Sequence, residues 1–163
     1  ALVREGFAAF LFDFTGHGES EGREDEATLP RQAEDLRAAL DLLESLDEID
    51  AGRIGVVGAS SGAATALVTG AAHPRIRLLV LRSGNAEGAP DAAPKVTAPT
   101  LLIVGELDEP ILAANKDLLP RLAGPKRLEV VAGGDHLFAE PAALRKAIDL
   151  TVRWFNDHLK RRP

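Results

Sequence analysis

The sequence has 163 residues, of which 45% are hydrophobic and 27% charged, as expected for one soluble domain over residues 1–163. Twenty-five acidic and nineteen basic residues give a net charge of −6. This balance argues against a nucleic-acid partner, because phosphate backbones are bound by clustered cations. The absence of cysteine excludes disulfides, thiolate catalysis and cysteine-ligated metals.

The amino end shows no targeting signal. Arg4 and Glu5 interrupt the first apolar residues, so this end does not resemble a signal peptide. No apolar run approaches the length needed to cross a bilayer. We therefore expect a soluble cytoplasmic protein with no membrane partner.

Apolar runs alternate with helical patterns along the chain. Strands covered on both faces are almost continuously apolar, and helices repeat apolar residues at spacings of three and four. The predicted strands span residues 7–14, 54–57, 76–81, 100–104 and 128–131. The predicted helices span residues 36–43, 63–72, 111–122 and 144–159.

This alternation of strands and helices indicates βαβ units, whose right-handed crossovers place helices on both faces of a sheet. We predict an α/β fold with a mostly parallel sheet of about five strands. Residues 15–28 and 83–99 are rich in turn-forming residues and are predicted loops. The second loop is too short for a large lid domain, so we expect an open site.

The motif with the clearest chemistry is Gly58-Ala59-Ser60-Ser61-Gly62, a Gly-x-Ser-x-Gly pattern between an apolar strand and a helix of small residues. In this context the pattern predicts a sharp, strained turn that holds the Ser60 hydroxyl at the carboxyl end of the sheet. Small neighbours let the strand and helix approach closely. The Ser61 N–H, at the start of the helix, could stabilise an oxyanion.

A serine hydroxyl needs a base, and that base needs an orienting group. Asp108 follows one predicted strand, and His136 follows the next. Parallel strands end at the same edge of the sheet, so Ser60, Asp108 and His136 are predicted to meet there. Their order along the chain is that of α/β-hydrolase triads.

Simpler interpretations exist for each of these residues. The serine turn could be only a turn, and Asp108 could cap a helix. His17 is a competing candidate for the base. No dinucleotide fingerprint, phosphate-binding loop or zinc-binding HExxH motif is present.

The segments DFTGHGESEG, GASSG, TLLIVGELDEP and GGDHLF resemble an α/β-hydrolase, most closely the dienelactone-hydrolase-like branch. The resemblance implies that Ser60 is the nucleophile, His136 the general base and Asp108 its orienting partner. It also implies that His17 has a structural role, in a loop near the site. The serine mechanism requires no metal and no organic cofactor. Dienelactone hydrolases proper have a cysteine nucleophile, so the serine in this sequence favours an esterase-like enzyme.

The resemblance starts at Phe7, whereas the family carries three further strands and a helix before this point. We expect the strand at 7–14 either to pair beside the strand at 54–57 or to leave a gap that other residues or a partner chain fill. In the first arrangement, a backbone N–H of Thr15 or Gly16 would supply the second oxyanion donor.

The predicted function is that of a serine hydrolase acting on small carboxylic esters or related acyl compounds. One alternative is a truncated scaffold with little catalysis, in which an exposed strand edge pairs two copies into a homodimer. A third hypothesis is a flavodoxin-like binding domain, which the lack of a phosphate-binding glycine pattern disfavours.

Overall fold

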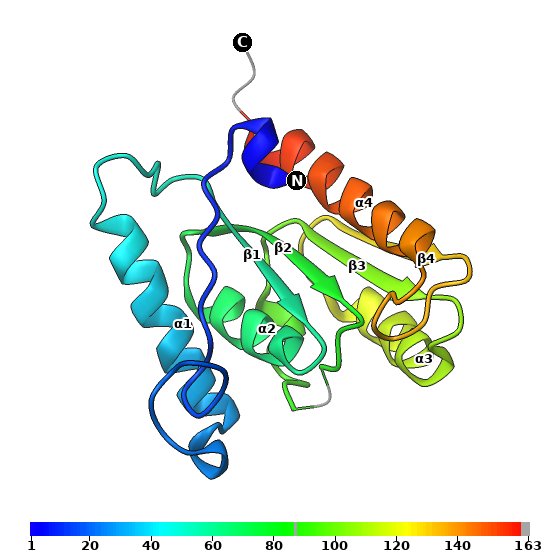
Figure 1. Ribbon diagram of the computed structural model, residues 1–163, viewed down its shortest axis with the longest axis horizontal. Coiled ribbons are helices and arrows are strands. Elements are labelled where there is room, and N and C mark those ends of the chain that lie inside the picture. The colour runs from blue at the N-terminus through cyan, green and yellow to red at the C-terminus, as the bar shows by residue number, and fades with distance from the viewer. Residues whose placement is uncertain (87, 161–163) are drawn as a thin grey trace.

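A parallel sheet of four strands, in the order β1-β2-β3-β4, forms the centre of the computed structural model, which describes residues 1–86 and 88–160 (Figure 1). The strands are β1 (Ile54–Ala59), β2 (Ile76–Arg82), β3 (Thr100–Gly105) and β4 (Lys126–Val131). Each pairs in parallel with the next one along the chain, with one register shift between β1 and β2 at Ile54 and Gly55. All four carboxyl ends therefore lie at one edge of the sheet.

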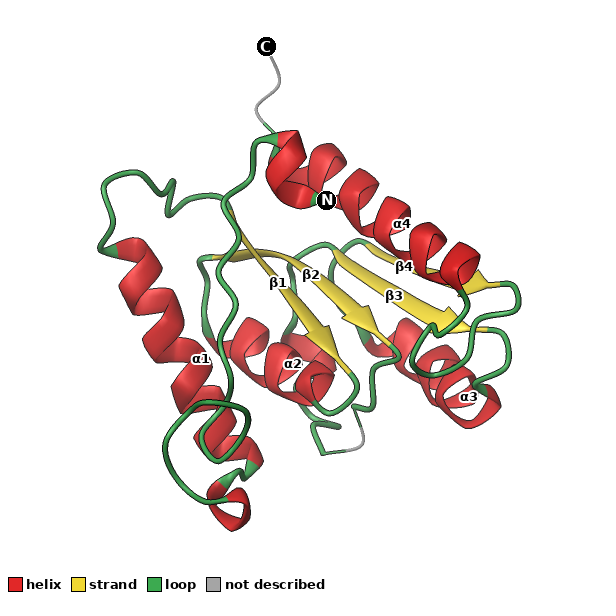
Figure 2. Cartoon of the chain, in the orientation of Figure 1, coloured by secondary structure: helices red, strands yellow, loops and turns green. Residues whose placement is uncertain are grey.

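Helices connect and cover these strands, as the sequence predicted (Figure 2). The helices are α1 (Leu29–Glu44), α2 (Gly62–Ala72), α3 (Glu109–Leu118) and α4 (Pro141–Leu159). Helix α1 begins earlier than expected because Thr28 caps it, its side chain accepting the Arg31 N–H at 3.4 Å, and because proline suits the first turn. Helix α3 ends at Leu118, where a short 3₁₀ turn containing Pro120 follows.

Two apolar clusters lie on opposite faces of the sheet. Leu79 and Leu81 of β2 pack with α1, α2 and the end of α3. Leu78 and Val80 of the same strand pack with α4 on the other face. Alternate side chains of a strand point to opposite faces, so β2 is buried on both. This confirms the prediction of a parallel α/β sheet covered on both faces.

The segment at 7–14 differs from its prediction as a buried strand. It runs without strand pairing, and the backbone N–H groups of Ala8 to Phe14 make no hydrogen bond to described residues (Figure 1). The side chain of Leu11 is 86% exposed. An apolar run becomes a strand only where a neighbouring strand completes the ladder, and β1 does not pair with this segment. Of the two arrangements expected for this segment, the pairing with β1 is therefore wrong, and the sheet formed by the described residues has four strands.

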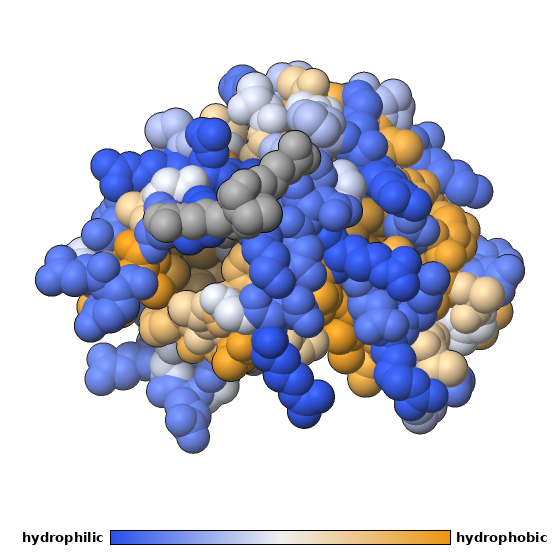
Figure 3. Space-filling view, turned by 90° about the horizontal axis from the view of Figure 1, so that it is seen from above, coloured by the Kyte–Doolittle hydropathy of each residue, from blue (hydrophilic) through white to orange (hydrophobic). Residues whose placement is uncertain are grey.

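The surface is mixed in character. Hydrophilic side chains cover most of the face shown in Figure 3, and apolar patches lie between them. Such patches are usual, because much of any protein surface is apolar. Within residues 1–86 and 88–160, no helix has both the length and the apolar character needed to cross a bilayer.

Two substitutions test whether the segment at 7–14 is exposed, as observed, or buried like a central strand. We expect Leu11→Ser to change the free energy of unfolding by less than about 0.5 kcal/mol, because the side chain is exposed. We expect Leu79→Ala, in the buried centre of β2, to cost about 2–5 kcal/mol. Urea denaturation of both variants measures this. A loss of 2 kcal/mol or more for Leu11→Ser would contradict the exposed position.

Candidate active site

Ser60 sits on the sharp turn between β1 and α2. Its backbone adopts a left-handed conformation, with φ of 51°, which is uncommon for a residue other than glycine. Backbone hydrogen bonds hold this turn: the Ser60 N–H donates to the Arg82 carbonyl at 3.0 Å, and the Ser60 carbonyl accepts the N–H groups of Ala63 and Asn85, both at 3.1 Å. The strained turn predicted for the Gly-x-Ser-x-Gly motif is therefore present.

The two glycines of the motif, Gly58 and Gly62, differ in the space available for a side chain. A Cβ at Gly58 would lie 2.6 Å from the Gly62 carbonyl oxygen, so only glycine allows this approach of strand and helix. A Cβ at Gly62 would meet only the Phe14 ring, at 4.0 Å. The close approach of strand and helix therefore depends on Gly58, whereas the turn has room for a Cβ at Gly62. Ala59, the last residue of β1, is exposed beside the serine.

Asp108 lies just beyond the end of β3, directly before α3. It occupies the N-cap position of that helix, but its side chain makes no capping hydrogen bond. Its Oδ2 instead lies 2.7 Å from Nδ1 of His136, and the Asp108 side chain is only 10% exposed. The helix-cap interpretation therefore does not describe where this carboxylate points.

His136 follows β4 in a loop packed closely against the loop that carries Asp108. A Cβ at Gly105 would lie 2.3 Å from the Gly134 carbonyl oxygen, so glycine is required for this contact. The Leu107 N–H donates to the same carbonyl at 2.9 Å. The His136 ring reaches the serine, with Nε2 3.1 Å from the Ser60 Oγ.

The structure thus brings together the three side chains that the sequence selected from separate strands. Hydroxyl, imidazole and carboxylate form a series in which each member lies within hydrogen-bonding distance of the next. The carboxylate fixes the ring orientation and favours a proton on Nδ1, which leaves Nε2 to accept one from the hydroxyl. The His136 side chain is 38% exposed, so a substrate can approach it.

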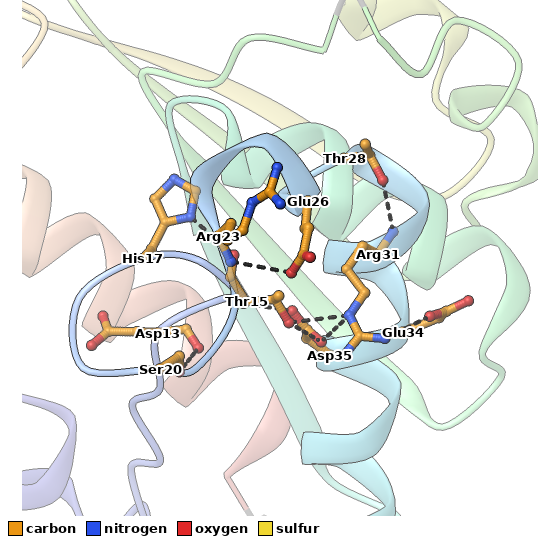
Figure 4. A network of polar contacts seen from close by, with 10 residues as sticks. All are labelled: Asp13, Thr15, His17, Ser20, Arg23, Glu26, Thr28, Arg31, Glu34 and Asp35. Atoms are coloured by element: carbon orange, nitrogen blue, oxygen red, sulfur yellow. Dashed lines mark hydrogen bonds and ion pairs between the residues drawn. The ribbon is translucent and has the colours of Figure 1, made fainter.

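The two residues predicted as second oxyanion donors are differently placed. The Thr15 N–H donates to Asp35 of α1 at 2.8 Å, and the Thr15 hydroxyl donates to the same carboxylate at 3.0 Å (Figure 4). The Gly16 N–H donates to the Glu21 carbonyl at 3.0 Å. Since both N–H groups are already engaged within the chain, this geometry does not support their predicted assignment.

Ser61 and His17 fall where the sequence analysis expected them. The Ser61 N–H stands at the start of α2 and has no acceptor among the described residues. The His17 Nδ1 lies 3.3 Å from the Thr15 carbonyl oxygen, within its own loop, and no contact joins its ring to Ser60. No group of three or more His, Cys, Asp or Glu side chains suited to a metal ion occurs within residues 1–86 and 88–160.

One contact at this site was missed from the sequence. Ser83, in the loop after β2, donates its hydroxyl to the His136 carbonyl at 2.7 Å. The available signal was its position: a polar residue directly follows an apolar strand, at the edge where Ser60, Asp108 and His136 also follow theirs. A polar residue of this kind is common in turns, so the signal alone does not separate it from a turn former.

Known proteins share the fold of this chain. A dienelactone hydrolase from Anabaena variabilis is 39% identical and superimposes with a TM-score of 0.77, over 81% of this chain and 62% of that one. A serine hydrolase homologue from Coxiella burnetii is 25% identical, with a TM-score of 0.72, over 86% of this chain and 65% of that one. The fold is therefore that of the α/β-hydrolases.

A curated relative from Mycobacterium tuberculosis, named for a proposed phosphoribosyl transferase activity, is 38% identical over 160 residues. The alignment covers 97% of this chain but 36% of that protein, so the chain spans about a third of its length. The model of the serine aminopeptidase S33 family matches residues 1–91, which include β1 and the Ser60 turn. This match covers more than half of the sequence, and the chain therefore belongs to the serine aminopeptidase S33 family of α/β-hydrolases.

Proposed function

We propose that this chain is a serine hydrolase that cleaves carboxylic esters or related acyl compounds. One observation carries the proposal: Ser60 Oγ, His136 Nε2, His136 Nδ1 and Asp108 Oδ2 lie in series at 3.1 and 2.7 Å. These distances suit proton transfer from a nucleophile to an oriented base. Membership of a hydrolase family supports the same chemistry.

In the first half of the proposed reaction, Ser60 Oγ attacks the substrate carbonyl carbon, and the hydroxyl proton passes to His136 Nε2. Asp108 holds the ring and stabilises the imidazolium that forms. The tetrahedral oxyanion accepts a hydrogen bond from the Ser61 N–H, which has no other acceptor among the described residues. The bond to the leaving group then breaks, and that group takes the proton from His136. The product is an acyl ester of Ser60.

In the second half, water replaces the leaving group. His136 takes a proton from the attacking water, a second tetrahedral intermediate forms, and its collapse returns that proton to Ser60 Oγ. The carboxylic acid leaves, and the hydroxyl is restored. Residues of this chain supply every proton transfer in the cycle.

The geometry of the site supports a reaction type, acyl transfer to Ser60, and does not by itself select the substrate. Attack by Ser60 is the same for an ester and for the amide bond that an aminopeptidase would cleave. We place esters first because Ser60 stands where dienelactone hydrolases, which the sequence resembles, carry a cysteine. The 38% exposure of the His136 side chain is consistent with access by a small ester. The M. tuberculosis relative is named for a different reaction, phosphoribosyl transfer. The series of Ser60, His136 and Asp108 does not point to that reaction.

The first test is the removal of the nucleophile. We expect Ser60→Ala to lower kcat for p-nitrophenyl acetate by about 10⁶-fold, to background, because it removes the hydroxyl that lies 3.1 Å from His136 Nε2. A fluorophosphonate should label Ser60 in the unaltered protein, as located by mass spectrometry. An aminoacyl p-nitroanilide measured in parallel separates esterase from peptidase activity. Hydrolysis that survives Ser60→Ala, or a folded protein that takes no label, would contradict the proposal.

The second test concerns the orienting carboxylate. We expect Asp108→Asn to lower kcat by about 10⁴-fold, because an amide favours the wrong ring tautomer. The matched control is Glu109→Gln, the next residue along the chain, whose side chain is exposed and takes no part in the contact with His136. We expect the control to keep kcat within about threefold. Equal losses in the two variants would show that this loop tolerates no change and would remove the support for Asp108.

A second candidate function is a self-associating scaffold with little catalysis, and the open edge of β1 favours it. Among the residues that the structure describes, β1 pairs only with β2, and Val57 on it is 50% exposed. An edge strand offers unpaired backbone donors and acceptors to another strand. A second copy of this chain could therefore pair along β1.

Sedimentation velocity over a range of protein concentrations tests this candidate. Self-association through β1 predicts a larger species whose share rises with concentration, and Val57→Lys should abolish it, because an edge lysine opposes strand pairing. A protein that stays monomeric at every concentration would overturn the scaffold candidate.

A further inference from the structure

The sheet order places the strand that leads to the proposed base, His136, far from the strand that leads to Ser60. Ser60 follows β1 and His136 follows β4, so two strands separate them. Three strand spacings amount to about 14 Å. The His136 loop must cross the ends of β3 and β2 before its ring meets the Ser60 hydroxyl. Whatever supports the loop at that crossing determines where the ring stands.

The residue at the end of β2 provides such a support. Ser83 is 2% exposed, and its hydroxyl donates to the His136 carbonyl at 2.7 Å. Its own N–H donates to the Ile103 carbonyl of β3 at 2.8 Å, which anchors it to the sheet. Its φ of 45° is left-handed, a strained conformation for serine that persists only where the surroundings impose it.

Neighbours of Ser83 extend this support in both directions. The Arg82 guanidinium lies 5.7 Å from the centre of the Phe138 ring, two residues beyond His136. On the other side, the Asn85 N–H donates to the Ser60 carbonyl at 3.1 Å. The loop that follows β2 thus contacts both the turn of the nucleophile and the loop of the base.

The same loop is also tied to the helix that follows Asp108. Asn115 of α3 is 1% exposed, and its Nδ2 donates to the Gly84 carbonyl at 2.8 Å. Helix α3 begins directly after Asp108. Residues 83–85 therefore connect the three strand ends that carry Ser60, Asp108 and His136.

We propose that Ser83 is a positioning residue for His136, whose buried hydroxyl sets the distance between the imidazole and Ser60. The inference rests on the proposed hydrolase function for its kinetic effect. Without the hydroxyl, the His136 carbonyl loses a donor and the loop is free to shift. A displacement of about 1 Å at a reacting group can cost about 100-fold in rate.

The kinetic test uses Ser83→Gly and Ser83→Ala. Both remove the hydroxyl, but glycine also suits the positive φ, so Ser83→Gly separates loss of the hydrogen bond from backbone strain. We expect kcat for p-nitrophenyl acetate to fall 10- to 100-fold in both, with KM within about threefold, because positioning acts on the chemical step. Substitutions that leave kcat within twofold of the unaltered protein would overturn the proposal.

The matched control is Thr100→Ala, at the opposite end of β3. Thr100 is also buried, and its hydroxyl likewise donates to a backbone carbonyl, that of Ala98 at 2.9 Å. Thermal unfolding should register the lost bond in this variant, while kcat should stay unchanged. If Thr100→Ala lowers kcat as much as Ser83→Gly does, the effect reflects general destabilisation and the proposal fails.

A second readout does not depend on turnover. The His136 Nδ1 proton, hydrogen-bonded to Asp108, should give a downfield proton NMR signal, assigned by its loss in Asp108→Asn. We expect Ser83→Gly to shift or broaden this signal and Thr100→Ala to leave it in place. A signal unchanged in Ser83→Gly overturns the proposal even if kcat falls. A protein without hydrolysis or labelling would defeat the proposed function, while this signal would still decide the role of Ser83.

Discussion

The geometry of the site depends on the reach of the His136 loop from the last strand of the sheet to the first. A parallel sheet places polar residues at one edge but spaces them by the strand separation, so neighbours in function need not be neighbours in the sheet. Asp108, on the strand beside that of His136, meets it across one strand spacing. Ser60 is two strands further away, and only a loop folded back over β3 and β2 brings the imidazole within 3.1 Å of it.

Strained backbone conformations occur at the residues around the His136 loop. The described residues other than glycine with positive φ are Ser60, Ser83 and Phe138, and all three lie in loops at the carboxyl end of the sheet. Strained conformations persist only where the surroundings impose them. Here the constraint comes from the two-sided core, in which β2 is buried by helices on both faces. A rigid β2 gives the loops on either side of it a fixed point of attachment.

In contrast to β2, which is buried on both faces, the edge strand β1 has no strand paired on its outer side among the described residues. The segment at 7–14 has the apolar content of a buried strand, yet it stays unpaired and Leu11 faces solvent. Its neighbour loop is nonetheless ordered by polar contacts, since Asp35 of α1 accepts both the N–H and the hydroxyl of Thr15. These contacts use the donor that the sequence had suggested for the oxyanion, which shows that a backbone N–H can be assigned only when its acceptor is known.

The sequence by itself determined the alternation of strands and helices, the turn at Ser60 and the choice of Asp108 and His136. Each of these follows from local patterns: apolar runs, small residues around a serine, and polar residues just after a strand. Only the tertiary structure decided the sheet order, the unpaired state of residues 7–14, the acceptors of Thr15 and Gly16, and the contact of Ser83 with His136. These features depend on which segments become neighbours in space, and residues 53 positions apart carry no mark of that in a single sequence.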